Sequence, residues 1–396
     1  MREQKKAAVV SATKFLPFHQ ALIEEGDIAA VVDVLKSGWL TTGTRTKDFE
    51  KAFAAYVGAS HAVALSSCTA ALHLALAAIG LKEGDEVILP TMTFSSTGEV
   101  VLYFKAKPVL VDCEPDSFQA DPAAIERAIT PRTRAIIAVH YAGSPARIDA
   151  ILEIARRHNL KVIEDAAHAL PTRYKGKMIG SLGDITCFSF YATKTLTTGE
   201  GGMATTENPE YADRMRILSL HGISRDAYKR YTAEGSWRYE ILDLGYKYNM
   251  TDIQAGLGLA QLAKCDAMRE RREQLAEYYT AALSSTEALT TPQAPPDVQH
   301  AWHLYVLQVN PQAISISRDR IIEELKERGV GCSVHFIPLH THPYYQRSLG
   351  YREGQFPHAE HHFERAISLP LFPGMTFEDS NHVIEALQAL AREYRR

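Results

Sequence analysis

The sequence has few cysteines, no excess of positive charge and no long hydrophobic run. Its five cysteines are scattered and odd in number, without CxxC spacing, which argues against a disulfide framework or a cysteine-ligated zinc site. The formal net charge of −4 argues against binding to nucleic acid or to an anionic membrane surface. No apolar stretch has the length of a signal peptide core at the start or of a membrane span elsewhere. We therefore expect a cytoplasmic protein with no nucleic-acid or membrane partner.

What the sequence does contain is a repeated alternation of strand-like and helix-like segments. Between residues 60 and 205, short apolar runs such as DEVILP and LKVIED alternate with amphipathic segments such as IDAILEIARRH. This alternation predicts an α/β fold with a mostly parallel sheet that is covered by helices on both faces. After residue 251, a long helical segment and a Pro-rich loop lead to a part of α+β character. We expect an N-terminal arm at 1–30, a large domain at 31–260 and a small C-terminal domain at 261–396.

In open α/β sheets, ligands bind at the carboxyl ends of the strands, and one such end carries hydroxyl groups. In VALSSCTAALHLAL, a predicted strand is followed by Ser66, Ser67, Cys68 and Thr69, and a helix begins at once. Unpaired amides at a helix N-terminus, with hydroxyls beside them, can bind a phosphate group. The alternative is an N-cap that only starts the helix.

A second strand end, in LKVIEDAAHAL, carries acidic residues. Glu164 and Asp165 end an apolar strand, and His168 follows three residues later. A carboxylate in this place could bind a metal, act as a base or partner a cationic ring. For Glu164 a helix cap or a surface charge is the better interpretation, whereas Asp165 and His168 fall on one side of the turn.

The third strand end is FSFYATKTLTTGEGG, which places Lys194 among hydroxyls and glycines instead of charged neighbours. A lysine held in such a site has a lowered pKa and becomes an amine nucleophile. Gly199, Gly201 and Gly202 allow close backbone packing or positive φ. A lysine in a flexible loop is the alternative. A phosphate site, an acid and a lysine nucleophile are together the three attachments of pyridoxal phosphate (PLP), which favours that cofactor.

The chain also resembles a known family. The motifs GWLTTG (38–43), SSCTAALHLAL (66–76), EGDEVILPTMTF (83–94), VIEDAAHA (162–169), GDITCFSFYATKTLTTGEGG (183–202) and YKYNMTDIQAG (246–256) are similar to those of the DegT/DnrJ/EryC1/StrS nucleotide-sugar aminotransferases. They occur in the family's order and span nearly the whole chain. The resemblance implies the PLP-dependent transferase fold of type I, with a large cofactor-binding domain and a smaller C-terminal domain.

The resemblance implies catalytic roles for Lys194, Asp165 and His168. Lys194 matches the lysine that forms the Schiff base with the cofactor, and Asp165 matches the partner of the pyridinium nitrogen. His168 matches a residue beside the ring, near its 3-oxygen. One branch of the family has histidine in place of the lysine and dehydrates sugars, so Lys194 argues against that branch.

Further residues match the family's cofactor-binding positions. Ser189, with the turn at Cys68 and Thr69, is implied to hold the phosphate, and Phe94 to stack on the pyridine ring. Asn249 matches an asparagine that reaches the cofactor phosphate of the partner subunit. The resemblance therefore implies a homodimer with shared active sites.

The implied activity is transfer of an amino group from L-glutamate to a keto-sugar nucleotide, in the synthesis of an amino sugar, a cell-surface glycan or an antibiotic. The motifs look most like those of enzymes that aminate C4 of a UDP-linked 4-keto sugar. The alternatives are a glutamine-dependent aminotransferase of an inosose or a 3-keto sugar, and a regulator that binds PLP without catalysis.

The substrate residues are harder to identify. His140 and Tyr141 end a predicted strand, so a substrate contact is plausible, and the resemblance implies that His335 lies near the sugar nucleotide. The H-x-H spacing of His340 and His342 could suit a metal. We expect no metal there, because no carboxylate or thiolate accompanies the pair in the sequence.

Overall fold

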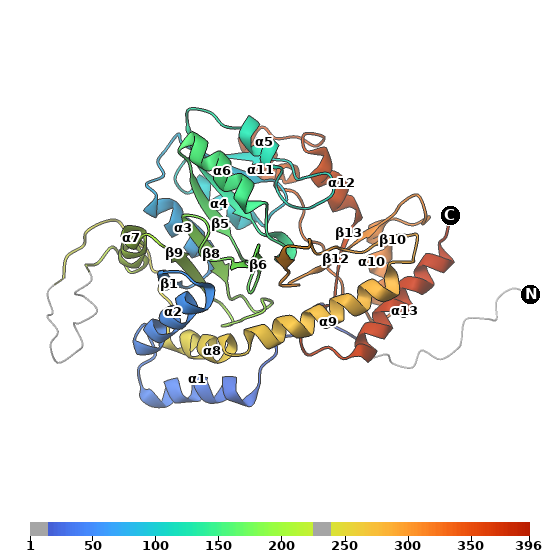
Figure 1. Ribbon diagram of the computed structural model, residues 1–396, viewed down its shortest axis with the longest axis horizontal. Helices are drawn as coiled ribbons and strands as arrows, with labels where there is room; N and C mark the ends of the chain where they lie inside the picture. The colour runs from blue at the N-terminus through green and yellow to red at the C-terminus, as the bar shows by residue number, and fades with distance from the viewer. Residues whose placement is uncertain (1–14, 225–238) are drawn as a thin grey trace, which may run out of the picture.

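A central sheet of seven strands organises the structure, a computed structural model that describes residues 15–224 and 239–396 (Figure 1). The strand order is β1-β9-β8-β5-β4-β2-β3. All neighbours pair in parallel except β9, which runs antiparallel to both β1 and β8. The strands are β1 (His61–Leu65), β2 (Glu86–Pro90), β3 (Lys107–Val111), β4 (Thr133–Val139), β5 (Lys161–Asp165), β8 (Ile185–Ser189) and β9 (Gly202–Thr206).

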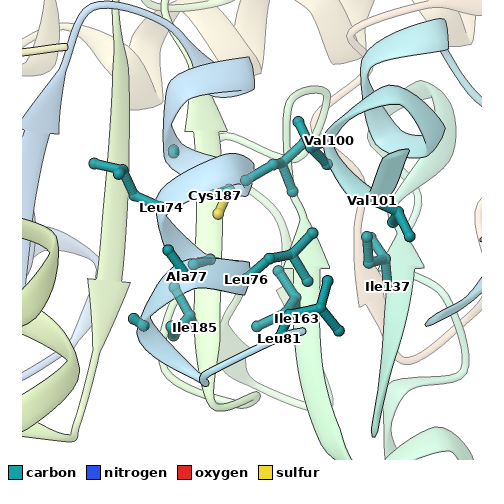
Figure 2. Close-up of a cluster of buried hydrophobic side chains, with 14 of the residues drawn as sticks. Leu74, Leu76, Ala77, Leu81, Val100, Val101, Ile137, Ile163, Ile185 and Cys187 are labelled. Atoms are coloured by element: carbon teal, nitrogen blue, oxygen red, sulfur yellow. The ribbon is translucent and has the colours of Figure 1, made fainter. Parts of the chain in front are cut away.

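One face of this sheet packs against α3 (Cys68–Ala78), α4 (Ser95–Leu102) and α7 (Pro209–Ser219). Helix α3 consists of small and aliphatic residues apart from His73 and Thr69, and nearly all of it is buried. In Figure 2, Leu76 of α3 and Val100 of α4 lie over Ile163 of β5 and Cys187 of β8. An all-round apolar helix of this kind is stable only when it is enclosed, so α3 is held rigidly over the sheet.

The opposite face is covered by α2 (Thr44–Val57) and α8 (Asp252–Leu262) at one end of the sheet, and by α5 (Pro122–Arg127) and α6 (Ile148–His158) at the other. Neighbouring strand residues alternate between the faces: Ile163 packs under α3, whereas Val162 packs under α6. Helices on both faces of a mostly parallel sheet confirm the predicted α/β class.

A second, three-stranded antiparallel sheet of order β10-β12-β13 lies in the C-terminal part. It packs in one hydrophobic cluster with α9, α10 and α13. The elements of this region are α9 (Cys265–Leu283), β10 (Leu289–Thr290), β11 (Val298–Gln299), β12 (Tyr305–Val309), α10 (Arg318–Glu327), η3 (Leu339–Thr341), α11 (Pro343–Leu349), α12 (Pro357–Arg365), β13 (Ala366–Leu369) and α13 (Phe377–Glu393). Strand β11 pairs with β6 (Arg173–Tyr174), next to β7 (Lys177–Met178), and so links the two parts of the chain.

The described N-terminal segment crosses to the C-terminal part before the first helix begins. Leu16 pairs with Val330, and its amide donates to the carbonyl of Gly329. Helix α1 (Glu25–Ser37) then packs against α8. Part of the predicted arm at 1–30 is therefore helical, and the predicted division at 31–260 and 261–396 stays a prediction.

Over 15–224 and 239–396, the helices include none that is both long and apolar enough to cross a membrane.

Candidate active site

A cavity of about 480 Å³ opens at the carboxyl edge of the central sheet. This volume lies within the range of about 300–1,000 Å³ that is usual for small-molecule sites. The three strand ends singled out in the sequence meet at this cavity. The predicted site residues that border it are Cys68, Thr69, Phe94, His140, Asp165, His168, Ser189, Lys194 and His335.

Lys194 lies in the turn after β8, where its amide donates to the carbonyl of Tyr191 at 2.9 Å. Its side chain is half-buried because one side borders the cavity. Burial lowers the pKa of the Lys194 amine to about 8, although the nearby Cys68 and Asp165 act in the opposite direction. Much of the amine is therefore neutral at mildly alkaline pH, as a nucleophile requires.

This pKa has a kinetic consequence. The cofactor-free protein should condense with PLP at a rate that rises about tenfold per pH unit below pH 8 and levels off above it, because only the neutral amine attacks. The rate can be followed by the visible absorbance of the product. Free Nα-acetyl-lysine is the control, since its rate should continue to rise towards about pH 10. A protein rate that follows the control would contradict the assignment.

Asp165, at the end of β5, is the acidic group of the cavity wall and only 5% exposed. The Thr97 hydroxyl donates to its Oδ2 at 2.8 Å, and the Ala167 amide donates to its Oδ1 at 3.2 Å. Burial raises the pKa of Asp165, although these hydrogen bonds and the charge of Lys194 act in the opposite direction, so a further cation beside the carboxylate would stabilise its charged form. A protonated ring nitrogen beside it would supply that cation.

The N-terminus of α3 is a candidate anion site. Ser67 caps the helix, with its hydroxyl accepting from the Ala70 amide at 3.0 Å. Cys68 and Thr69 are the first helical residues, so their amides have no partner within the helix and border the cavity. Ser189, at the end of β8, lies on the same cavity wall. The arrangement suits a phosphate group.

Gly202 of β9 allows the sheet to approach this helix terminus. A Cβ at position 202 would lie 2.4 Å from the Ser67 carbonyl oxygen and 2.6 Å from the Cys68 nitrogen. We expect Gly202→Ala to displace the start of α3, with a loss of about 1–3 kcal/mol of stability and weaker binding of PLP. Thermal unfolding and a cofactor titration measure these effects. Gly26→Ala is the matched control, because no atom lies within 4 Å of the added methyl group; equal behaviour of the two variants contradicts the prediction.

His168 and Phe94 occupy different depths of the cavity. His168 is buried, and its Nδ1 accepts from the Ala142 amide at 3.2 Å. Burial holds the pKa of His168 well below its usual range, so the ring is neutral. Phe94 is 58% exposed, 5.7 Å from the ring of Phe336. Phe94 therefore stands at the open side, where it can cover a flat ligand.

The structure corrects the interpretation of Glu164. Its side chain is fully buried and is not a surface charge. Its Oε2 lies 2.9 Å from Nε2 of His140, and its Oε1 accepts from Thr186 and from the Gly183 amide. The alternation of side chains along β5 explains the difference, because Glu164 points away from the face that Asp165 occupies.

The same contacts change the roles expected for His140 and Tyr141. His140 borders the cavity, but both of its ring nitrogens are engaged, one with Glu164 and the other with the Ala146 amide at 3.0 Å. The buried Tyr141 hydroxyl donates to the carbonyl of His335. Both nitrogens of His140 and the hydroxyl hydrogen of Tyr141 are thus engaged within the protein, and the predicted substrate contacts stay a prediction.

His335 keeps a place at the cavity. Its Nδ1 lies 2.9 Å from the Ser368 hydroxyl, and burial lowers its pKa to about 4. A neutral histidine whose Nε2 has no partner within the described part of the chain suits a polar, uncharged part of a substrate.

The buried His340 belongs to an internal hydrogen-bond chain. Its Nδ1 lies 2.7 Å from Thr91 Oγ1, and its Nε2 lies 2.8 Å from Glu360 Oε1. A carboxylate therefore does accompany His340, contrary to the expectation from sequence, because α12 folds back onto it. Within the described residues, no group of three or more potential ligands could hold a metal ion.

Several cavity residues escaped the sequence analysis. Phe18 and His19 reach the cavity from the N-terminal segment, and Phe336 reaches it from the C-terminal part. Thr97 is the direct partner of Asp165. A sequence signal existed only for Thr97, which lies in the first turn of a helix after the PTMTF motif.

Comparison with known proteins decides the family. Residues 21–388 match the model of the DegT/DnrJ/EryC1/StrS aminotransferase family. The chain belongs to this family. The spore coat polysaccharide biosynthesis protein SpsC of Bacillus subtilis is 51% identical over 379 residues, 96% of this chain and 97% of that protein.

Solved structures of sugar aminotransferases have the same fold. Spr1654 of Streptococcus pneumoniae in its PLP form superposes with a TM-score of 0.90 at 34% identity, over 96% of this chain and 99% of that one. Its PMP form also has a TM-score of 0.90. The sugar aminotransferase CalS13 of Micromonospora echinospora has a TM-score of 0.84 at 26% identity, over 94% and 99% of the two chains. The protein is a PLP-dependent sugar aminotransferase, which confirms the predicted fold type, enzyme class and cofactor.

The residues of the cavity fit this cofactor. Asp165 is a buried carboxylate with a raised pKa, and the first amides of α3 have no partner within the helix, at the place where Gly202 keeps the backbone close. Lys194 borders the same space with an amine of lowered pKa. Asp165 would hold the ring nitrogen, Ser67–Thr69 and Ser189 the phosphate, and Lys194 the aldehyde carbon.

Proposed function

We propose that the enzyme transfers an amino group from L-glutamate to a keto-sugar nucleotide, at C4 of a UDP-linked 4-keto sugar. The observation that carries the proposal is the meeting of Lys194 and Asp165 at one cavity, beside the candidate anion site at the start of α3. The name of SpsC supports a product that enters a surface polysaccharide.

In this mechanism the bound cofactor supplies an electron sink for the carbanion that forms at the substrate's α-carbon. Nζ of Lys194 takes the proton from that carbon, and its lowered pKa leaves the amine free to accept it. The Asp165 carboxylate keeps a proton on the ring nitrogen, because a nearby negative charge favours the cation. Thr97 fixes the orientation of Asp165 through its hydrogen bond to Oδ2.

The open side of the cavity suits the sugar nucleotide. Phe94 and Phe336 present aromatic surface there, and His335 offers a neutral polar group. Aromatic faces beside hydrogen-bonding groups are typical of sites for sugars and bases.

Half-reactions test the proposal. Glutamate should bleach the visible absorption band of the PLP-loaded enzyme, and a UDP-linked 4-keto sugar should restore it. Glutamine in place of glutamate, and an inosose or a 3-keto sugar in place of the 4-keto sugar, test the alternative aminotransferases. Absence of bleaching by every amino donor tested would contradict the proposal.

We also propose that the enzyme works as a homodimer in which Asn249 reaches the partner's cofactor phosphate. Asn249 lies outside the cavity of its own chain, with its amide donating to Thr42 Oγ1 at 2.7 Å. Large apolar residues near it in sequence are strongly exposed, including Ile241 and Leu244 at 71% and 82%. Exposed apolar surface of this kind is typical of a protein interface.

Subunit mixing tests the shared site. Lys194→Ala and Asn249→Ala should each abolish or strongly reduce turnover, and a mixture of the two, refolded together, should recover activity that neither parent has. Hybrid dimers then contain one site with both residues intact. Mass spectrometry verifies that hybrid dimers have formed. If these hybrids have no activity, the shared site is contradicted.

A further inference from the structure

The segment His300–Leu304, between β11 and β12, has an unusual backbone next to the cavity. Trp302 is buried with φ at +50°, a left-handed conformation that is rare for a bulky residue. Its amide donates to His300 Nδ1 at 2.8 Å, and the two rings stack at 4.2 Å. The flanking Ala301 and Leu304 amides donate to the carbonyls of residues 143 and 142. Backbone strain held by so many contacts is typical of functional sites.

Arg272 of α9 binds the backbone of this segment through hydrogen bonds to its carbonyl groups. It is 1% exposed, and its Nη1 donates to the carbonyls of Trp302, His303 and Leu371 at 3.3, 3.3 and 2.6 Å. Its Nε and Nη2 have no hydrogen-bond partner within 15–224 and 239–396. Burial lowers the pKa of Arg272 only to about 10, so a positive charge remains behind the cavity wall at neutral pH.

The polar residue that this segment presents to the cavity is His303. It is 6% exposed, and its ring centroid lies 4.4 Å from that of His168. Its Nδ1 is buried and lacks a partner among the described residues, which disfavours a proton there and leaves Nε2–H as the donor on the cavity side. His168 likewise accepts a hydrogen bond at Nδ1, so its proton lies on Nε2.

Both rings are neutral for the same reasons. Burial is the main cause that holds the pKa values of His168 and His303 well below their usual range. The charge of Lys194 adds to it for His168, and His168, Lys194 and Arg272 add to it for His303. Two uncharged N–H donors thus lie side by side, close to Lys194 and in front of a buried cation. Two N–H donors next to a buried positive charge favour the binding of an anionic hydrogen-bond acceptor.

The two substrates differ in where they carry negative charge. The α-carboxylate of an amino donor is bonded directly to the carbon whose proton Lys194 removes. The phosphates of a sugar nucleotide are several bonds away from the keto carbon. A hydrogen-bond donor of the protein that lies close to Lys194 is therefore placed to contact the α-carboxylate of the amino-acid substrate.

We propose that the Nε2–H group of His303, backed by the buried Arg272 cation, binds the carboxylate on the reacting carbon of the amino donor. This inference rests on the proposed function. The aromatic side of the cavity at Phe94 and Phe336 is left for the sugar nucleotide.

The test uses the PLP-loaded enzyme and glutarate, a dicarboxylate that lacks the amino group and cannot react. Isothermal titration calorimetry measures its dissociation constant in the wild type, His303→Asn and His303→Gln. The Gln amide reaches the position of Nε2, whereas the shorter Asn amide does not. We expect Asn to weaken glutarate binding about 10- to 100-fold, as loss of a hydrogen bond to a charged group implies, and Gln to restore most of it.

Kinetics separate this role from a structural one. His303→Asn should raise the KM for glutamate by a similar factor and leave the KM for the keto-sugar nucleotide nearly unchanged. Unchanged glutarate binding in His303→Asn, or an equal rise of KM for both substrates, overturns the inference. The proposed function still holds in that case if glutamate bleaches the wild-type enzyme. A wild type that neither binds glutarate nor reacts with glutamate overturns both. If the His303→Asn variant does not fold, His303→Leu is used in its place.

Discussion

Lys194→Ala is expected to lose the covalent link to PLP and to lower turnover by at least about 10⁴-fold. The substitution removes both the nucleophile and the base, and no other lysine borders the cavity among the described residues. The fold should persist, because Lys194 is half-buried and its amide hydrogen bond to Tyr191 is a backbone contact. Steady-state kinetics and the visible band measure the loss.

Borohydride reduction identifies the lysine independently. In the wild type the reduced label should be found on the peptide that contains Lys194, and in Lys194→Ala it should be absent. Lys105→Ala is the control, since that lysine is exposed and lies 3.4 Å from Glu83 in a surface ion pair. A wild-type label on any other lysine would falsify the central assignment.

Asp165→Asn is expected to lower turnover by about 10³-fold with little change in cofactor binding. The amide removes the negative charge that keeps the ring nitrogen protonated, so the carbanion loses its electron sink. An asparagine oxygen can still accept from Thr97 and the Ala167 amide, which should preserve the local structure. The observables are kcat and the rate of α-proton exchange from glutamate.

The neighbouring carboxylate provides the matched control. Glu164→Gln also neutralises a buried acid of β5, but this side chain contacts His140, Thr186 and the Gly183 amide on the other side of the strand. It should reduce thermal stability and leave the proton-exchange rate far above that of Asp165→Asn. Equal loss of exchange in the two variants would mean that Asp165 has no special relation to the ring.

Much of the site could be predicted because its residues follow strands directly. A parallel α/β sheet brings the carboxyl ends of its strands to one edge, so Cys68, Asp165 and Lys194 had to be near one another once the strands were identified. The chemical type of each residue then indicated the cofactor.

Residues that face one another across the fold could not be predicted in this way. His140 and Tyr141 also follow a strand, yet their polar atoms are engaged by Glu164 and by the His335 carbonyl. Those partners lie 24 and 194 residues away in the chain. Spacing in a sequence carries no information about such contacts.

The sequence by itself determined the fold class, the cofactor chemistry and the family, since these depend on local periodicity and on residues attached to single strands. Only the tertiary structure decided what surrounds the reacting atoms: the N-terminal segment at Phe18 and His19, the His168–His303 pair and the buried Arg272 behind it. The physical reason is that burial, tautomer and electrostatic field depend on groups that distant segments bring together, and on the water that they exclude.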